Sequence, residues 1–116
     1  MALVIPEVEL AGGGRKMPVV GLGTASFPPP TPEEFQEAML NAMRLGYRHF
    51  DTASLYATEA PLGEAIVEAL RQGIIKSRQE LFITSKLWCT DCYGDRVLPA
   101  IQQSLRSVFL FVYFLF

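Results

Sequence analysis

The chain has 116 residues, of which 50% are hydrophobic, and its 10 basic and 12 acidic side chains leave a formal charge of −2. This length allows one domain with a modest core, and the apolar content excludes a chain that is disordered throughout. No block of basic residues is present that could follow a phosphate backbone, so we expect no nucleic-acid partner.

Neither the first nor the last residues of the sequence predict a membrane segment. The apolar run at the N-terminus is broken by Pro6 and Glu7, and it lacks the positive charge with which a signal peptide begins. The apolar run Val108–Phe116 is much shorter than the roughly 20 residues of a spanning helix. We therefore expect a cytoplasmic protein without a membrane partner.

The first predicted elements are a hairpin and a buried strand. Residues 8–10 and 17–20 are typical of extended segments, and they flank the glycine-rich turn at 11–16. The sequence VVGLGT at 19–24 then predicts a buried strand, which a proline-rich loop follows.

A helix is predicted over residues 31–46. Thr31 is a suitable N-cap, Pro32 suits the first helical position, Glu34 completes a capping box, and Gly46 ends the helix. Apolar side chains recur every three or four positions and predict one buried face, made of Phe35, Ala38, Met39, Ala42, Met43 and Leu45.

Strands and helices alternate along the rest of the chain. Strands are predicted over 47–53 and 80–88, and helices over 59–73 and 94–107. This order predicts a parallel sheet with right-handed crossovers. The first of these helices has Leu62, Ile66, Ala69 and Leu70 on one side, and the second has Leu98, Ile101 and Leu105 in register.

Two architectures share this order of elements. A doubly wound nucleotide-binding fold requires G-x-G-x-x-G after the first strand, but Ser26 stands where the third glycine should be. A (β/α)₈ barrel places polar, reactive residues at the carboxyl ends of its strands, and here Thr24, Asp51 and Lys86 hold such positions. We therefore predict an α/β fold that is part of a TIM barrel, with an N-terminal hairpin and about three βα units.

Asp51, Tyr56 and Lys86 form the candidate catalytic group. Neighbouring parallel strands lie about 4.8 Å apart, so Asp51 and Lys86 can form an ion pair, and Tyr56 begins the loop beside them. An ammonium next to a phenol favours the phenolate, which makes the phenol a better proton donor to a carbonyl oxygen. An ordinary surface ion pair with a nearby loop tyrosine remains the alternative.

The sequence WCTDC contains two cysteines, Cys89 and Cys92, in a C-x-x-C spacing. This spacing occurs in redox proteins and in zinc sites, but no second cysteine pair is present and the only histidine is the distant His49. A thioredoxin-like pair opens a helix, whereas a loop with Asp91 and Gly94 follows here. A redox module remains an alternative interpretation.

Five segments, VVGLGT, GYRHFDTASLY, PLGEAI, LFITSKLW and VLPAIQQSL, together resemble the aldo-keto reductases. The sequences of these segments are most similar to plant members of the chalcone reductase and deoxymugineic acid synthase types, and the resemblance covers residues 4–106. It implies a TIM-barrel oxidoreductase that passes a hydride from NADPH to a small aldehyde or ketone, and full-length members of the family are usually monomeric.

The resemblance also assigns expected roles to individual residues. Asp51, Tyr56 and Lys86 correspond to three members of a catalytic tetrad, with Tyr56 as the proton donor. The fourth member is a histidine at the end of the next strand, and His49, two residues before Asp51, is interpreted as filling the barrel interior. Cofactor contacts are expected at Gly23, Thr24 and Asp51. Tyr56 and Trp88 are expected to contact the substrate, although core packing is the alternative for Trp88.

The sequence departs from the family pattern after residue 106. A polar turn and a histidine-bearing strand are expected there, but the tail at 107–116 is uncharged and aromatic, with an alternation that permits a strand. We interpret residues 1–116 as one truncated or mis-spliced barrel domain with a foreign C-terminal end. The alternative function is therefore a non-catalytic fragment that lacks the catalytic histidine and most of the NADPH site.

Overall fold

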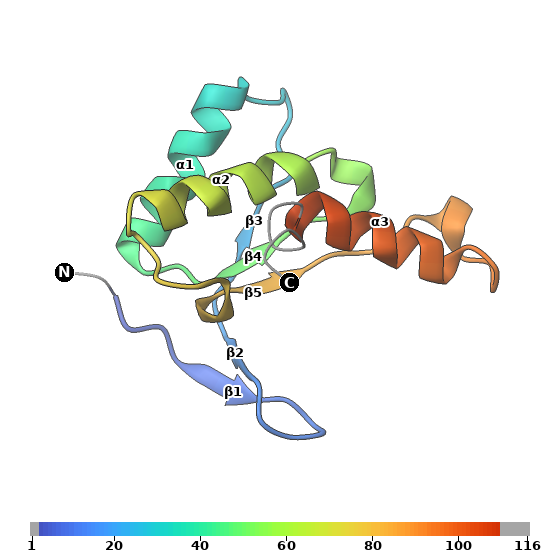
Figure 1. The fold of residues 1–116 in the computed structure, drawn as a ribbon, viewed down its shortest axis with the longest axis horizontal. Helices are drawn as coiled ribbons and strands as arrows, with labels where there is room; N and C mark the ends of the chain where they lie inside the picture. The colour runs from blue at the N-terminus through green and yellow to red at the C-terminus, as the bar shows by residue number, and fades with distance from the viewer. Residues whose placement is uncertain (1–2, 110–116) are drawn as a thin grey trace.

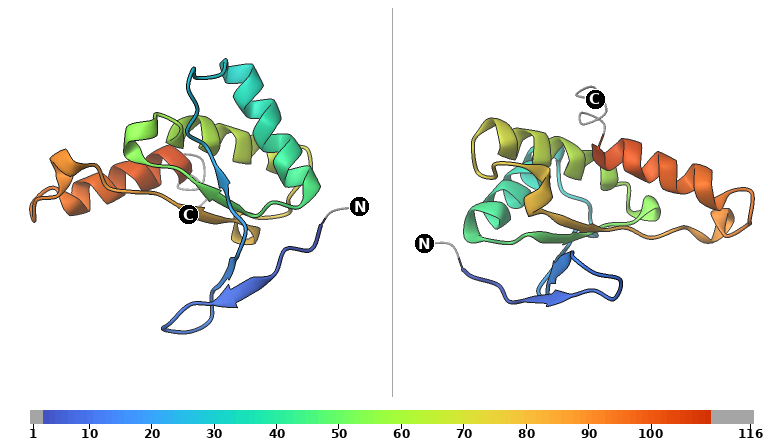
Figure 2. Two further views of the ribbon diagram at one scale, coloured as in Figure 1. Left: turned by 180° about the vertical axis from the view of Figure 1, so that it is seen from behind. Right: turned by 60° about the horizontal axis from the view of Figure 1, so that its bottom comes forward.

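A three-stranded parallel sheet lies between the helices and the N-terminal hairpin (Figure 1). The computed structural model describes residues 3–109, and its sheet consists of β3 (Leu22–Gly23), β4 (His49–Asp51) and β5 (Phe82–Thr84), in that order. The three long helices lie on one side of this sheet and the N-terminal hairpin lies on the other (Figures 1 and 2). The predicted α/β class and the parallel alternation of strands and helices are confirmed.

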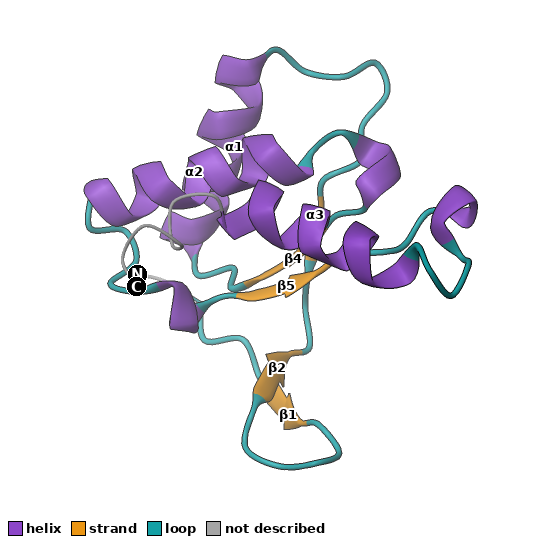
Figure 3. Ribbon diagram, turned by 45° about the vertical axis from the view of Figure 1, so that its right-hand side comes forward, coloured by secondary structure: helices purple, strands orange, loops and turns teal. Residues whose placement is uncertain are grey.

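The hairpin consists of β1 (Glu7–Glu9) and β2 (Lys16–Pro18), which pair antiparallel as predicted. Three consecutive glycines at 12–14 adopt positive φ angles between 91° and 98°, which side-chain-bearing residues rarely adopt, so they allow the turn. The hairpin extends away from the helices (Figure 3), and the Arg15 guanidinium donates to the Leu81 carbonyl at 2.8 Å. This bond ties the turn of the hairpin to the segment just before β5.

Helix α1 (Pro32–Leu45) begins and ends as the sequence predicts. The Thr31 hydroxyl accepts from the Glu34 backbone, the Glu34 carboxylate accepts from the Thr31 backbone, and Gly46 ends the helix with a φ of 108°. The predicted face is correct for its four buried members, Phe35, Met39, Ala42 and Met43. Ala38 and Leu45 are exposed and Leu40 is buried instead, because the buried stripe turns around the helix toward α2.

Helix α2 (Glu59–Arg71) packs between α1 and α3 and supplies the centre of the core. Leu62, Ile66 and Ala69 have no exposed surface, and Leu70 is partly buried, as the periodicity predicts. Phe50, at the middle of β4, is also fully buried beneath the helices. The core therefore consists mainly of one face of α1, one face of α2 and the central strand.

The predicted buried strand at 19–24 is wrong in extent and in burial. Only Leu22 and Gly23 pair with β4, and the side chains of Val19 and Val20 are 49% and 45% exposed. β3 has a neighbour on one side only, so its preceding residues run along the edge of the sheet where little covers them.

Helix α3 (Val97–Phe109) lies next to β5, and the C-terminal end of α3 touches α2. Leu98, Ile101 and Leu105, which the sequence places in register on this helix, are 63%, 48% and 38% exposed, and Ile101 and Leu105 line a groove beside β5. Val108 continues the helix and is buried, so the tail does not begin as a strand there. The rest of the predicted apolar tail, 110–116, lies outside the described residues.

Within residues 3–109, no helix is both long enough and apolar enough to cross a membrane.

We predict that Gly63→Ala destabilises the fold by about 1–3 kcal/mol, because overpacking of a tight contact forces the backbone apart. A Cβ at Gly63 would lie 2.6 Å from the Ser107 carbonyl oxygen, at the contact between α2 and α3. Urea unfolding measures the loss, and Gly94→Ala is the matched control because a Cβ there meets nothing within 4 Å. Equal unfolding free energies for the two variants would show that α3 does not pack against α2 in this way.

Candidate active site

The register of the sheet brings the carboxyl ends of the three strands together. Gly23 is paired with Asp51, and Asp51 is paired with Thr84. Asp51 is the last residue of β4, and Lys86 follows β5 by two residues. Gly23 and Lys86, which lie 28 and 35 positions from Asp51 in the chain, therefore meet Asp51 at the same edge of the sheet.

Lys86 and Asp51 form the ion pair that the sequence predicts. Lys86 Nζ donates to Asp51 Oδ2 at 2.6 Å and to the Thr52 carbonyl at 3.1 Å. The hydrogen bond that Lys86 donates to Asp51 raises the pKa of Lys86 above its usual value, and desolvation partly opposes this effect. The side chains of Lys86 and Asp51 remain 46% and 36% exposed, so the pair is a site of fixed charge that solvent still reaches.

Tyr56 lies directly beside the ammonium. It ends the 3₁₀ turn Ser54–Tyr56, labelled η1, and the centroid of its ring is 4.9 Å from Lys86 Nζ, within cation–π range. The backbone NH and the hydroxyl of Ser54 both donate to the Lys86 carbonyl, at 3.3 and 3.2 Å, so η1 is tied to the segment that carries the lysine. The structure thus brings Asp51, Tyr56 and Lys86 together.

A cluster of three threonine hydroxyls lies beneath this group. Thr58 Oγ1 lies 2.7 Å from Thr24 Oγ1 and 2.8 Å from Thr52 Oγ1, and the Thr24 hydroxyl also donates to the Asp51 carbonyl at 3.0 Å. Thr24 and Thr52 are 4% and 0% exposed, so these bonds are made away from water. The cluster joins β3, β4 and the start of α2 around the catalytic candidates. Sequence analysis missed Thr52 and Thr58, because threonines have no distinctive spacing and Thr24 lies 34 positions from Thr58.

Two further features beside Tyr56 were not predicted. Ala57 ends η1 with a φ of 57°, a left-handed conformation that an alanine rarely adopts. Glu59 is 7% exposed, and its carboxylate accepts from the Ser85 hydroxyl at 2.5 Å, which links the first turn of α2 to the end of β5. A buried glutamate at the start of a helix has no distinctive sequence pattern, since its serine partner lies 26 positions away.

The remaining predicted residues have different environments. Gly23 is exposed, and a Cβ there would meet no atom within 4 Å. Trp88 is 41% exposed, so the core-packing alternative for it is wrong.

The two ring nitrogens of His49 lie 3.0 Å from the Pro18 carbonyl oxygen and 2.7 Å from the Thr84 hydroxyl, and its ring packs edge-on against Phe82. His49 therefore links β4 to the end of the hairpin strand β2 and to the neighbouring strand β5, and it makes no described contact with Lys86.

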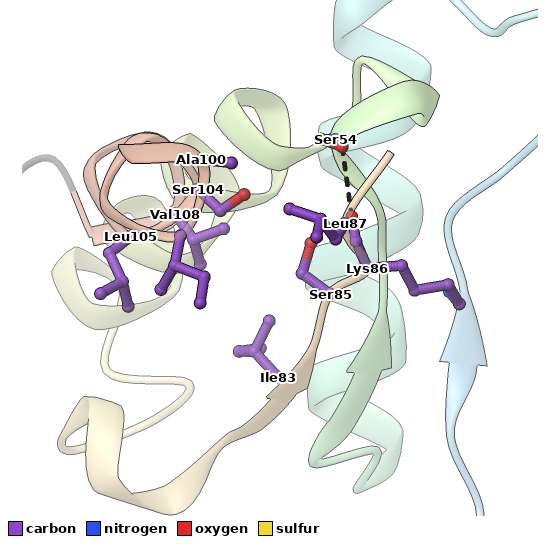
Figure 4. A pocket seen from close by; sticks show the side chains of 10 residues that line it. Ser54, Ile83, Ser85, Lys86, Leu87, Ala100, Ser104, Leu105 and Val108 are labelled. Carbon is purple, nitrogen blue, oxygen red and sulfur yellow. Dashed lines mark hydrogen bonds between the residues drawn. The ribbon is translucent and has the colours of Figure 1, made fainter. Parts of the chain in front are cut away.

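Two hollows border the group but neither contains all of it. Tyr56 lines a hollow of about 480 Å³ between its own turn and the proline-rich start of α1. A second, apolar groove of about 200 Å³ lies between β5 and α3. Figure 4 shows Ile83, Leu105 and Val108 around this groove, whereas the Lys86 side chain extends away from them. The charged end of Lys86 therefore lies with Asp51 and Tyr56 and not in the groove.

We predict that Asp51→Asn lowers the pKa of Lys86, because the carboxylate is the main cause of its raised value. The ammonium favours folding at every pH below the ordinary lysine pKa of about 10.4, and this contribution disappears as the pH rises through the raised value. An alkaline titration of the lysine side-chain NMR signals measures the change, and Asp95→Asn is the control. An unchanged Lys86 pKa in Asp51→Asn would contradict the described ion pair.

Comparisons with known proteins show what the chain is similar to. The model of the Aldo/keto reductase family matches residues 19–110. A 7-acetyl-epi-neemfruitin B aldo-keto reductase from Melia azedarach is 60% identical, and an NADPH-dependent codeinone reductase from Papaver somniferum is 55% identical, each over 104 residues. Each match covers 90% of this chain and 32% of the relative, so the chain spans about a third of the length of the curated relatives it matches.

Solved structures show the same relationship in three dimensions. An aldo-keto reductase of the silkworm Bombyx mori in complex with NADP has a TM-score of 0.83 and 37% sequence identity, and the match covers 92% of this chain and 35% of the silkworm protein. The family match extends over most of the described residues and includes all three strands of the parallel sheet. The chain therefore belongs to the aldo/keto reductase family.

Proposed function

We propose that Asp51, Tyr56 and Lys86 are the proton-donating part of an NADPH-dependent carbonyl reductase. The observation that supports this proposal is the position of Lys86 Nζ, 2.6 Å from the Asp51 carboxylate and 4.9 Å from the Tyr56 ring centroid. A fixed ammonium beside a phenol suits proton donation to an oxygen that is gaining negative charge. The similarity to an NADPH-dependent codeinone reductase is consistent with this chemistry.

Each of the three side chains has a distinct role in the proposal. The Tyr56 hydroxyl donates its proton to the carbonyl oxygen of the substrate, which becomes an alcohol. The Lys86 ammonium stabilises the phenolate that remains, and Asp51 keeps that ammonium charged and oriented. A proton from solvent then restores Tyr56, and solvent reaches the site because Lys86 is 46% exposed.

The residues at the ends of β3 and β4 fit the nicotinamide half of NADPH. Gly23 has open space where a side chain would be, so a flat ring or a ribose can approach its backbone. Asp51, its partner in the register, offers a partly exposed carboxylate to hydroxyl groups. The buried Thr24 hydroxyl bonds inside the protein, so Thr24 would support Gly23 and offer backbone atoms only. When bound, NADPH would supply the hydride that reduces the carbonyl carbon.

The substrate in this proposal is a small aldehyde or ketone. Tyr56 would contact its oxygen, and the exposed Trp88, two residues after Lys86, would form an aromatic wall beside it. The three parallel strands would be the first part of a (β/α)₈ barrel, in which reactive residues collect at the carboxyl ends of the strands.

A second candidate is a chain that binds NADPH weakly and does not turn over substrate by itself. It is favoured by the exposure of Lys86 and Asp51, because charges in contact with water stabilise a transition state less than charges in a closed site. Mixing the purified 116-residue protein with NADPH and an aromatic aldehyde separates the two candidates. Aldehyde-dependent NADPH oxidation supports the reductase, whereas its absence supports the second candidate.

We predict that Tyr56→Phe lowers the rate of carbonyl reduction by about 10²–10⁴-fold, the usual contribution of a positioned general acid. The affinity for NADPH should stay the same, because the lost hydroxyl acts on the substrate oxygen. Aldehyde-dependent oxidation measures the rate, and quenching of Trp88, the single tryptophan, measures cofactor binding.

The control for this prediction is Tyr93→Phe, which removes the hydroxyl of a 62% exposed tyrosine on the loop before α3. If the 116-residue chain shows no turnover, the same two variants are compared in a chimera in which residues 19–110 replace the matching part of the codeinone reductase. Equal rates for Tyr56→Phe and Tyr93→Phe in an active protein would rule out Tyr56 as the proton donor.

A further inference from the structure

The loop between β5 and α3 carries two thiols that the proposed reductase chemistry does not use. Cys89 and Cys92 are both free and exposed, and they are the chain's only cysteines. They follow Trp88 directly and lie on the loop that leads from Lys86 to α3. Neither thiol contributes to the described core, so packing does not account for them.

The backbone of this loop holds the two cysteines close together. Cys89–Asp91 forms a 3₁₀ turn, labelled η3, and the Cys92 NH donates to the Cys89 carbonyl at 3.4 Å. The ends of a four-residue turn closed by such a bond are less than about 7 Å apart between Cα atoms. Disulfides join Cα atoms roughly 4.4–6.8 Å apart. The folded turn therefore places the cysteines at a separation that a disulfide can bridge.

Two other uses of a C-x-x-C pair are less compatible with this loop. Among residues 3–109, no group of three or more His, Cys, Asp or Glu side chains is placed to hold a metal ion. A thioredoxin-like pair sits at the start of a helix, but α3 begins only at Val97, five positions after Cys92. A site that is modified by thiol–disulfide exchange needs neither a third ligand nor a helix dipole.

We propose that Cys89 and Cys92 form a reversible intramolecular disulfide by exchange with a small disulfide such as glutathione disulfide. One thiolate attacks a sulfur of the small disulfide, which forms a mixed disulfide and releases one small thiol. The second cysteine then attacks the protein sulfur of the mixed disulfide and releases the other small thiol. The protein loses two protons and two electrons, and the small disulfide gains them.

The disulfide would change the contacts of Trp88. The Cys92 thiol donates to the Trp88 carbonyl at 3.4 Å, and the Asp91 NH donates to the same carbonyl at 2.9 Å. Oxidation removes the thiol proton, so the first of these bonds is lost. Because Trp88 is the chain's single tryptophan, its fluorescence reports the redox state of the pair.

Reaction of the reduced 116-residue protein with glutathione disulfide, followed by acid quenching and intact-mass measurement, tests the proposal. The natural chain should lose two hydrogen atoms, keep no glutathione, and return to its starting mass with a thiol reductant. Cys89→Ser and Cys92→Ser should each keep one glutathione, because no second thiol is present to displace it. Glutathione on both cysteines of the natural chain, or disulfide-linked dimers, would overturn the proposal.

A comparison of the folded and urea-unfolded chain tests the role of the turn. The folded protein should close its disulfide at a several-fold lower concentration of glutathione disulfide, since η3 already holds the cysteines together. Trp88 fluorescence should change on oxidation of the natural chain and not of a variant with both cysteines replaced by serine. Equal closure in the folded and unfolded chains would show that η3 contributes nothing and that the loop is not a prepared site.

Discussion

The parallel register of β3, β4 and β5 is the constraint on which the rest of the structure depends. It places Gly23, Asp51 and Thr84 side by side, so the segments that leave the three strands emerge at one edge. Lys86 reaches Asp51 only because both strands run in the same direction and end at the same level. An antiparallel pairing would place the two partners of the ion pair at opposite ends of the sheet, and a shift by one residue would turn one of them to the opposite face.

The Tyr56 turn is held in place by groups that take no part in the proposed chemistry. Ser54 bonds the Lys86 backbone, and Thr58 joins the buried hydroxyls of Thr24 and Thr52 beneath the turn. These neutral hydrogen bonds let Ala57 keep its unfavourable backbone conformation. The charged pair itself is half exposed, and exposed pairs contribute little to stability, so its value lies in orienting charge. Neutral hydrogen bonds thus make the site rigid, and the ion pair supplies its charge.

Much of the fold follows from local sequence signals, whereas burial depends on distant neighbours. The capping box of α1, the hairpin and the alternation of strands and helices are encoded by residues a few positions apart, and they are correct. The predicted burial of the strand at 19–24 is wrong and the apolar side of α3 is largely exposed, because a sequence pattern shows that a segment is apolar but not what covers it. In the site, Asp51 and Lys86 were predictable from strand ends. The contacts of Thr58 with Thr24 and of Glu59 with Ser85 were not, since these partners lie 34 and 26 positions away.

The loop after β5 connects the proposed catalytic chemistry to the proposed redox chemistry. Lys86, Trp88 and Cys92 lie within seven residues, and the Trp88 carbonyl accepts from the Cys92 thiol. On one side the loop is fixed to η1 through Ser54, and on the other it leads into α3, whose apolar side chains are largely exposed. A change at the cysteines would therefore act first on Trp88. The ion pair, held by the sheet register and by the bonds to Ser54 and Thr52, would stay in place.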